Sequence, residues 1–235
     1  MLPPVGAALG WGALAASSLV IGAMLGILRP WPKPLVGAVL AFGAGALISA
    51  VSFDLVEEGS RLGDPGYVGL GLAAGALTYF GLDHVIDRPG SSSGGSALAL
   101  GAFLDGIPEQ MVLGIGLASG EGVGVGLLVA IFVSNLPEAI GSATDMSAAG
   151  RSKRSIRLLW IGVAVICTLA TVVGWAIADN ASDNLKAIVD GFAAGALLVM
   201  LIDSMIPDAV RKGGDVSGLV TVLGFAVAAA LSRVT

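Results

Sequence analysis

Charge is scarce in this 235-residue chain. Only 12% of the residues are charged, 12 basic and 17 acidic, whereas 55% are hydrophobic and 36 are glycine, with a mean hydropathy of +0.91. Soluble domains carry about 25% charged residues, so the composition excludes a water-soluble globule. Disordered segments are poor in apolar residues, so disorder is excluded as well. The class that remains is an integral membrane protein.

The chain also has only one cysteine and one histidine, and it lacks several enzyme motifs. The single cysteine, Cys167, excludes an intrachain disulfide framework, and its place in an apolar run favours a small packing residue. One histidine cannot build the His-Glu-x-x-His motif of zinc proteases, and no phosphate-binding Gly-x-x-x-x-Gly-Lys-Ser/Thr motif is present. A net charge of −5 provides no basic surface for nucleic acid. The N-terminus lacks the basic region of a cleavable signal peptide, so the first span is expected to be retained.

Apolar runs bounded by charge, proline or Ser/Gly clusters predict an all-α polytopic membrane protein with eight transmembrane helices. The expected ranges are 5–28, 34–56, 66–87, 97–118, 123–146, 156–178, 186–207 and 216–234. With these ranges, nine basic residues fall on one side of the membrane and only Arg61, Lys186 and Arg233 on the other. The positive-inside rule then places both termini outside.

Internal repeats indicate how the helices are organised. Residues 42–47 (Phe-Gly-Ala-Gly-Ala-Leu) are similar to 192–197, and residues 103–109 are similar to 132–138. The helices of each pair are expected to run in opposite directions, which is typical of inverted-topology repeats in secondary transporters. We therefore predict one transporter domain over 1–235 with a 3+2+3 organisation. Its parts are a first repeat (5–87), a central helix pair (97–146) and an inverted repeat (156–234).

The two central helices carry carboxylates at membrane depth. Asp105 and Glu109 are four residues apart on one helix face, and Asn135 lies three residues before Glu138. A carboxylate in the bilayer costs about 2.5–3.5 kcal/mol, and no basic residue lies between 89 and 150. A bound cation, protons or water in a cavity must therefore offset the charge. The oxygen-rich donor set suits a divalent cation.

Prolines interrupt both central helices at matching positions. Pro108 and Pro137 have no N–H group, so they free the carbonyls of Leu104 and Val133. Freed carbonyls at membrane depth are tolerated where they line a cavity or meet another helix. Paired interruptions of this kind at repeat-related positions indicate a transport site.

Five further polar residues are candidates for an ion pathway, and for each of them a plain interfacial or structural role stays open. Ser134 has the same spacing to Glu138 as Asp105 has to Glu109, and Asp145 lies two turns beyond Glu138 on the same face. The others are Asp54 and Asp203, which follow the two outer repeat motifs, and His84, at the inner end of the third span.

The segments 105–110 (Asp-Gly-Ile-Pro-Glu-Gln) and 134–139 (Ser-Asn-Leu-Pro-Glu-Ala) resemble the two metal-binding motifs of the ZIP (Zrt/Irt-like) divalent-metal transporters. The resemblance covers nearly the whole chain, including the Gly/Ala-rich second and seventh spans. It implies a carrier with a metal site between the fourth and fifth helices. By position, Glu109 and Glu138 match the two bridging carboxylates, Asp105 matches the first motif histidine, and Asn135 matches the polar residue after the second.

The departures from the family pattern concern the metal. Asp105 and Ser134 stand where the motifs usually have histidine, Gly106 stands where the first has asparagine, and the sixth span offers no carboxylate for a second metal. The missing imidazoles favour harder cations such as Mn²⁺, Fe²⁺ or Mg²⁺ over zinc.

The functional prediction is divalent-cation transport by an alternating-access carrier that ATP does not drive and that is not an enzyme. The expected location is the cell (inner or plasma) membrane. The expected partners are the transported ion (zinc, manganese, iron or similar, with no resident cofactor) and lipid, with a homodimer left open and no nucleic acid. The alternatives are a non-transporting metal-binding or sensor protein and an intramembrane hydrolase.

Overall fold

The computed structural model describes residues 4–29, 31–86, 95–118 and 125–232, and within these ranges every regular element is a helix. The long helices are α1 (Pro4–Leu28), α2 (Lys33–Ala50), α4 (Pro65–Ile86), α5 (Gly95–Ala118), α6 (Val125–Ala148), α7 (Lys153–Asn180), α8 (Asp183–Met200) and α10 (Ser217–Leu231). Shorter elements join them: η1 (Val51–Glu57), α3 (Glu58–Leu62), η2 (Leu201–Met205), α9 (Ile206–Gly213) and η3 (Gly214–Val216). The all-helical expectation is confirmed for these residues.

Each range expected from the sequence overlaps one of the long helices. Five stretches of the described residues are long and apolar enough to cross a membrane: Val5–Leu28, Lys33–Leu62, Gly126–Ala148, Lys153–Asp179 and Asp183–Leu231. The last is 49 residues long and runs through α8, α9 and α10. The number of membrane crossings and the side of the termini remain predictions.

Large apolar side chains cover the outside of the bundle. Leu77 on α4, Leu158 on α7 and Leu219 on α10 are 72%, 60% and 76% exposed. Their helices present many more exposed leucine, isoleucine and valine side chains. Extended apolar surface of this kind is rare on soluble monomers and marks contact with lipid or another protein. The surface agrees with the composition, which excludes a water-soluble globule.

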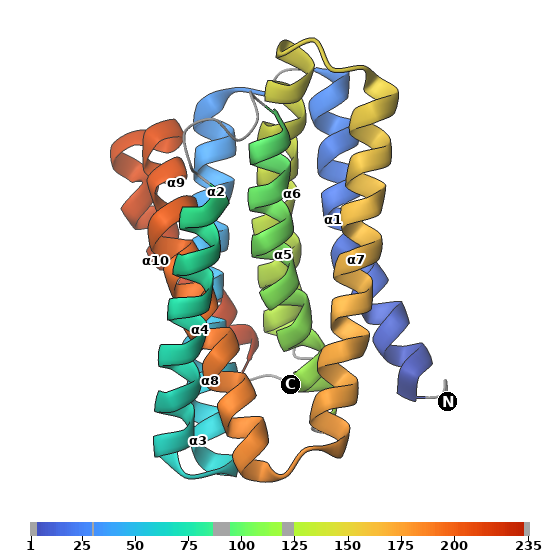
Figure 1. Ribbon diagram of the computed structural model, residues 1–235. Helices are drawn as coiled ribbons and strands as arrows, with labels where there is room; N and C mark the ends of the chain where they lie inside the picture. The colour runs from blue at the N-terminus through green and yellow to red at the C-terminus, as the bar shows by residue number, and fades with distance from the viewer. Residues whose placement is uncertain (1–3, 30, 87–94, 119–124, 233–235) are drawn as a thin grey trace.

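The long helices pack in two groups (Figure 1). In the first group, α4 packs on α8 and α2 packs on α10. In the second group, α1 packs on α6 and α7, and α5 packs on α7. The groups meet where α2 contacts α6 and where α5 contacts α8. We call them the α2/α4/α8/α10 group and the α1/α5/α6/α7 group.

Glycines bring the helices of each pair into backbone contact. A Cβ atom built on Gly75 of α4 would collide with the carbonyl oxygen of Phe192 in α8, and one on Gly45 of α2 would collide with that of Thr221 in α10. Small residues allow this close approach between membrane helices, where van der Waals packing replaces the hydrophobic effect as the main attraction. The distance between the helices of each pair is therefore set by contact between their backbones.

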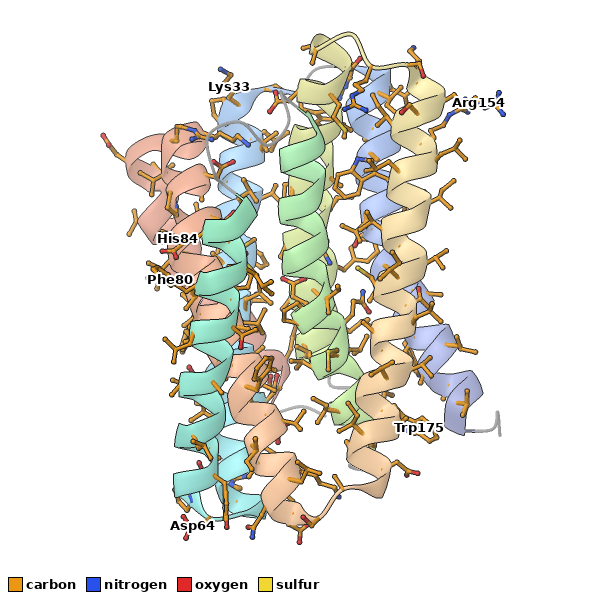
Figure 2. The ribbon with its side chains drawn as sticks, viewed as in Figure 1. Lys33, Asp64, Phe80, His84, Arg154 and Trp175 are labelled. Atoms are coloured by element: carbon orange, nitrogen blue, oxygen red, sulfur yellow. The ribbon has the colours of Figure 1, made fainter. Side chains whose placement is uncertain are left out.

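Charged side chains lie at both ends of the bundle. Lys33 and Arg154 lie at one end, and Asp64 lies at the other (Figure 2). The end with Asp64 also holds α3, the beginning of α1 and the connection between α7 and α8 (Figure 1). Which side of the membrane each end faces stays a prediction from the positive-inside rule.

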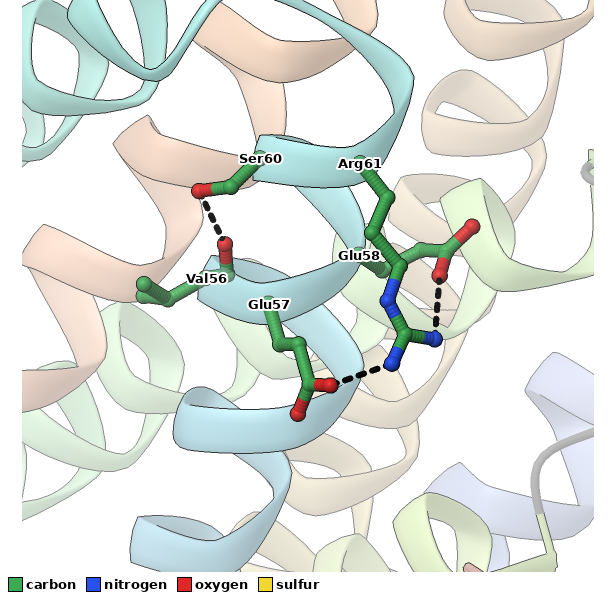
Figure 3. A network of polar contacts seen from close by, with 5 residues as sticks. All are labelled: Val56, Glu57, Glu58, Ser60 and Arg61. Atoms are coloured by element: carbon green, nitrogen blue, oxygen red, sulfur yellow. Dashed lines mark hydrogen bonds and ion pairs between the residues drawn. The ribbon is translucent and has the colours of Figure 1, made fainter.

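An exposed network of ion pairs and a hydrogen bond lies at the end of the bundle that holds α3. The Arg61 guanidinium pairs with Glu57 and lies 4.0 Å from the carboxylate of Glu58, while the Ser60 hydroxyl donates to the Val56 carbonyl oxygen at 2.6 Å (Figure 3). Exposed pairs contribute about 0.2–1 kcal/mol each. The network is therefore a surface feature rather than part of the core.

Two π-helical segments follow the outer repeat motifs. η1 continues α2 and contains Asp54, and η2 continues α8 and contains Asp203. A π segment widens the helix and is frequent at functional sites. The sequence repeat did not predict these segments, because hydropathy does not distinguish i→i+5 from i→i+4 hydrogen bonding.

Candidate metal centre

The two proline motifs lie in the middle of α5 and α6, which contact each other. Both helices continue through their proline, Pro108 in α5 and Pro137 in α6. Pro137 cannot donate to the Val133 carbonyl four residues earlier. The motif acids Glu109 and Glu138 directly follow the prolines. The sequence therefore folds locally into two continuous helices with an internal proline, which carry their acids on adjacent elements.

Glu109 is the most buried of the motif acids whose side chains are described. Its side chain is only 2% exposed, and the Ser134 hydroxyl of α6 donates to its Oε1 at 3.2 Å. The same hydroxyl lies 3.0 Å from the Ile131 carbonyl oxygen within α6. Ser134 thus joins the two motifs by a hydrogen bond between α6 and α5.

Asn135 is fully buried, yet its amide Oδ1 and Nδ2 have no hydrogen-bond partner among the described residues. Leaving a buried polar atom unsatisfied costs about 1–3 kcal/mol. Such an atom in a native protein calls for an explanation, such as a bound ion or water. Asn135 lies three residues before Glu138 and shares its face of α6. The amide oxygen is therefore available as a ligand beside Glu138, which is itself half-buried.

The other helix group reaches this site at a glycine. A Cβ atom on Gly43 of α2 would lie 2.9 Å from the Ser134 Cα atom. Gly43 belongs to the first copy of the outer repeat motif, and Ser134 is the residue that binds Glu109. The backbones of the two helix groups thus meet directly beside the candidate site.

The remaining predicted residues are distributed along the bundle. Asp105 lies in α5, and its side chain is outside the described residues. Asp145 is exposed near the end of α6, and Asp203 is exposed in η2. Asp54 is half-buried in η1 and hydrogen-bonded to Ser232. His84 is exposed on α4, where its ring lies 4.2 Å from that of Phe80 (Figure 2), so it is not part of the buried site.

Two residues near the helix interfaces were not identified as functional from the sequence. Cys167 of α7 is fully buried and interacts electrostatically with Glu109 and Glu138. Asp190 of α8 is only 3% exposed and lies against Gly59, close enough to interact electrostatically with Glu58 and Lys186. The apolar run around Cys167 predicted burial but not its neighbours, and no motif or spacing in the sequence singled out Asp190, which lies in the interior of α8.

The described side chains do not form a ready-made ligand cluster. Among them, no three His, Cys, Asp or Glu side chains lie close enough together to hold one metal ion. What they provide is a buried carboxylate with a hydroxyl partner, a second carboxylate and an unpartnered amide. Chemically, this arrangement offers oxygen donors to a cation.

Comparison with known proteins gives the family of this chain. Residues 89–232 match the family described as ZIP Zinc transporter, and this range contains both proline motifs. The chain belongs to the ZIP family. It is also 31% identical over 188 residues to an Arabidopsis thaliana protein named "Putative zinc transporter".

That match covers 75% of this chain and 30% of the Arabidopsis protein, so the chain spans about a third of the relative's length. Membership of the ZIP family identifies a multi-pass membrane protein of a transporter family, not an enzyme family. In its two proline motifs, this chain has Glu109 and Glu138, with Asp105 and Ser134 four residues before them.

Proposed function

We propose that this chain transports divalent metal cations across a membrane, through a site between α5 and α6 formed by Asp105, Glu109, Asn135 and Glu138. The observation that carries the proposal is the buried pairing of Glu109 with Ser134 beside the unpartnered Asn135 amide. Ionised carboxylates in the membrane interior need a counter-charge. A passing divalent cation supplies that charge and also uses the amide oxygen.

The mechanism that we propose is alternating access by two helix groups. Packing of α4 on α8 has a counterpart in packing of α10 on α2, and α5 on α7 has one in α6 on α1. These pairs are the ones that inverted 3+2+3 repeats would relate. They support an inverted-repeat arrangement. Eight crossings with both termini outside, and movement of one group against the other around the central site, are part of the same proposal.

Residues toward the ends of the bundle complete the proposed route. Asp145 and Asp203 are exposed, and Asp54 is half-buried, so these acids are placed to attract cations on the way to or from the centre. Ion gradients rather than ATP are the proposed driving force. The cell membrane and lipid contacts are part of the same proposal.

The other functions have less support. An aspartyl hydrolase would need Asp105 to face a second acid, but Asp145 and Asp203 are exposed on separate elements. A non-transporting metal sensor shares the same site, so only a flux measurement separates it from a carrier.

The first prediction concerns uptake by purified protein in liposomes, measured for Zn²⁺, Mn²⁺, Fe²⁺, Cd²⁺ and Mg²⁺ with and without a pH gradient. The Glu109→Gln/Glu138→Gln double variant is expected to lower uptake to the level of protein-free vesicles, because neutral amides no longer offset the ion's charge. Loss of one metal-orienting partner alone costs about 10–100-fold, so removal of two ligands should abolish uptake.

A double variant of exposed acids controls for the loss of charge. Glu57→Gln/Asp183→Asn changes the same net charge at the surface of η1 and α8, and it should transport like the wild type. Wild-type uptake by the Glu109/Glu138 variant would contradict the site. Metal binding without any flux by the wild type would favour the sensor.

A further inference from the structure

The side chain of Lys212 reaches from one helix group to the other. Lys212 lies in α9, which stands between α8 and α10 in the chain and packs on α2, so it belongs to the α2/α4/α8/α10 group. α9 lies toward the end of the bundle that holds Lys33 (Figures 1 and 2). A Cβ atom built on Gly141 of α6, in the other group, would lie 3.2 Å from the Lys212 Nζ atom. The ammonium group therefore lies against α6, in the space that a side chain at 141 would fill.

The place of this contact is on the proposed ion route. Gly141 is three residues after Glu138 and four residues before Asp145, so the three positions share one face of α6. A helix rises about 1.5 Å per residue, so the ammonium group contacts α6 about 4.5 Å along the helix from Glu138, on the side of Asp145. Glu138 is half-buried and Asp145 is exposed. An ion that moves along this face between the candidate site and the surface must therefore pass Lys212.

An acid of the same helix holds Lys212 in this place. The Nζ atom donates to the Asp208 Oδ2 atom at 2.8 Å, and the lysine side chain is only 20% exposed. Asp208 also pairs with Arg211, whose side chain is 73% exposed. One carboxylate thus serves two cations, and the cluster keeps a net positive charge. The end of α9 is fixed on α2, because a Cβ atom on Gly37 would collide with the backbone nitrogen of Gly213.

We propose that Lys212 is a gate on the ion route, closing the stretch of α6 between Glu138 and Asp145 in the described arrangement of the helix groups. This proposal rests on the proposed transport function and deepens it. A fixed ammonium group repels a divalent cation, and the repulsion is stronger where protein replaces water. Because Lys212 is carried by one helix group and contacts the other, a movement that separates the groups at this end also removes the charge from the route.

The test measures access of small cations to the face of α6 that Lys212 contacts. Gly141→Cys protein in detergent is labelled with a positively charged and with a neutral methanethiosulfonate reagent, and the ratio of the two rates cancels the reactivity of the thiol itself. Lys212→Gln in the same protein is expected to raise the ratio of charged to neutral labelling by about fivefold or more. Lys212→Arg keeps the charge and should keep the ratio low. Protein without the Gly141→Cys change gives the background from Cys167, which is fully buried.

Arg211→Gln is the matched control. It removes the same charge from a neighbouring residue that pairs with the same carboxylate, but its side chain is exposed, so the labelling ratio should change little. In liposomes, Lys212→Gln should raise the initial rate of Mn²⁺ uptake at low metal concentration, and Arg211→Gln should not. An unchanged labelling ratio in Lys212→Gln, or equal changes in the two variants, would overturn the gate. The transport proposal fails separately, if the Glu109→Gln/Glu138→Gln protein still transports, and that result does not alter the labelling ratio.

Discussion

Gly75→Ala is expected to destabilise the folded protein by about 3 kcal/mol or more, because its new methyl group would meet backbone rather than a movable side chain. The atom in its way is the Phe192 carbonyl oxygen of α8. The collision can be relieved only if α4 and α8 move apart, and this movement would loosen the whole contact between the two helices. The measurement is thermal unfolding in detergent followed by circular dichroism, in which Tm should fall sharply.

The same helix offers a control for this substitution. Gly69 of α4 has no atom within 4 Å of an added Cβ, so Gly69→Ala should leave stability unchanged or raise it by about 0.5–1 kcal/mol through helix propensity. Equal effects of the two substitutions would show that the α4–α8 contact is not as close as described.

Asn135→Leu is expected to act in two opposite directions. Without metal, the variant should be more stable than the wild type by about 1–3 kcal/mol, because two unsatisfied buried polar atoms are removed. With metal, the stabilisation seen in the wild type should be largely lost. Binding at a hundred times the dissociation constant stabilises by about 2.7 kcal/mol, so thermal unfolding with and without Zn²⁺ or Cd²⁺ can measure both effects.

Ser49→Ala is the companion variant. Ser49 of α2 is fully buried, and its hydroxyl also has no partner among the described residues. It should gain stability without losing the metal response, since it lies outside the proposed ligand set. If Asn135→Leu kept the full metal response, Asn135 would not be a ligand.

The course of the helices could be predicted because apolar runs bounded by Arg29, Lys33 or Gly150 mark helix ends directly. The candidate site could be predicted in part, since Pro-Glu in an apolar run needs a charge partner. The partner of Glu109 is Ser134, and this hydrogen bond depends on the register between α5 and α6. The local sequence pattern of each helix does not contain the register between the two helices.

Cys167 shows the same limit in another way. Its apolar neighbours in sequence predict only that this side of α7 packs against other helices, here α1 and α6. The sulfur itself lies beside Gly106 of α5, in the space that a larger side chain would fill. A gap in one helix that fits a side chain of another is visible only in three dimensions. The π segments are equally hidden, since they alter hydrogen bonding without altering composition.

The contact between Gly43 and Ser134 has a consequence for how such a bundle can tilt. In the proposed alternating-access movement this contact would act as a fulcrum, because backbone meets backbone there and leaves little room for sliding. Rotation of one helix group about this point would swing the two ends of the bundle through wide, opposite arcs. The carboxylates beside the fulcrum would barely be displaced. An ion held there could therefore be exposed first at one end of the bundle and then at the other while itself moving only a short distance.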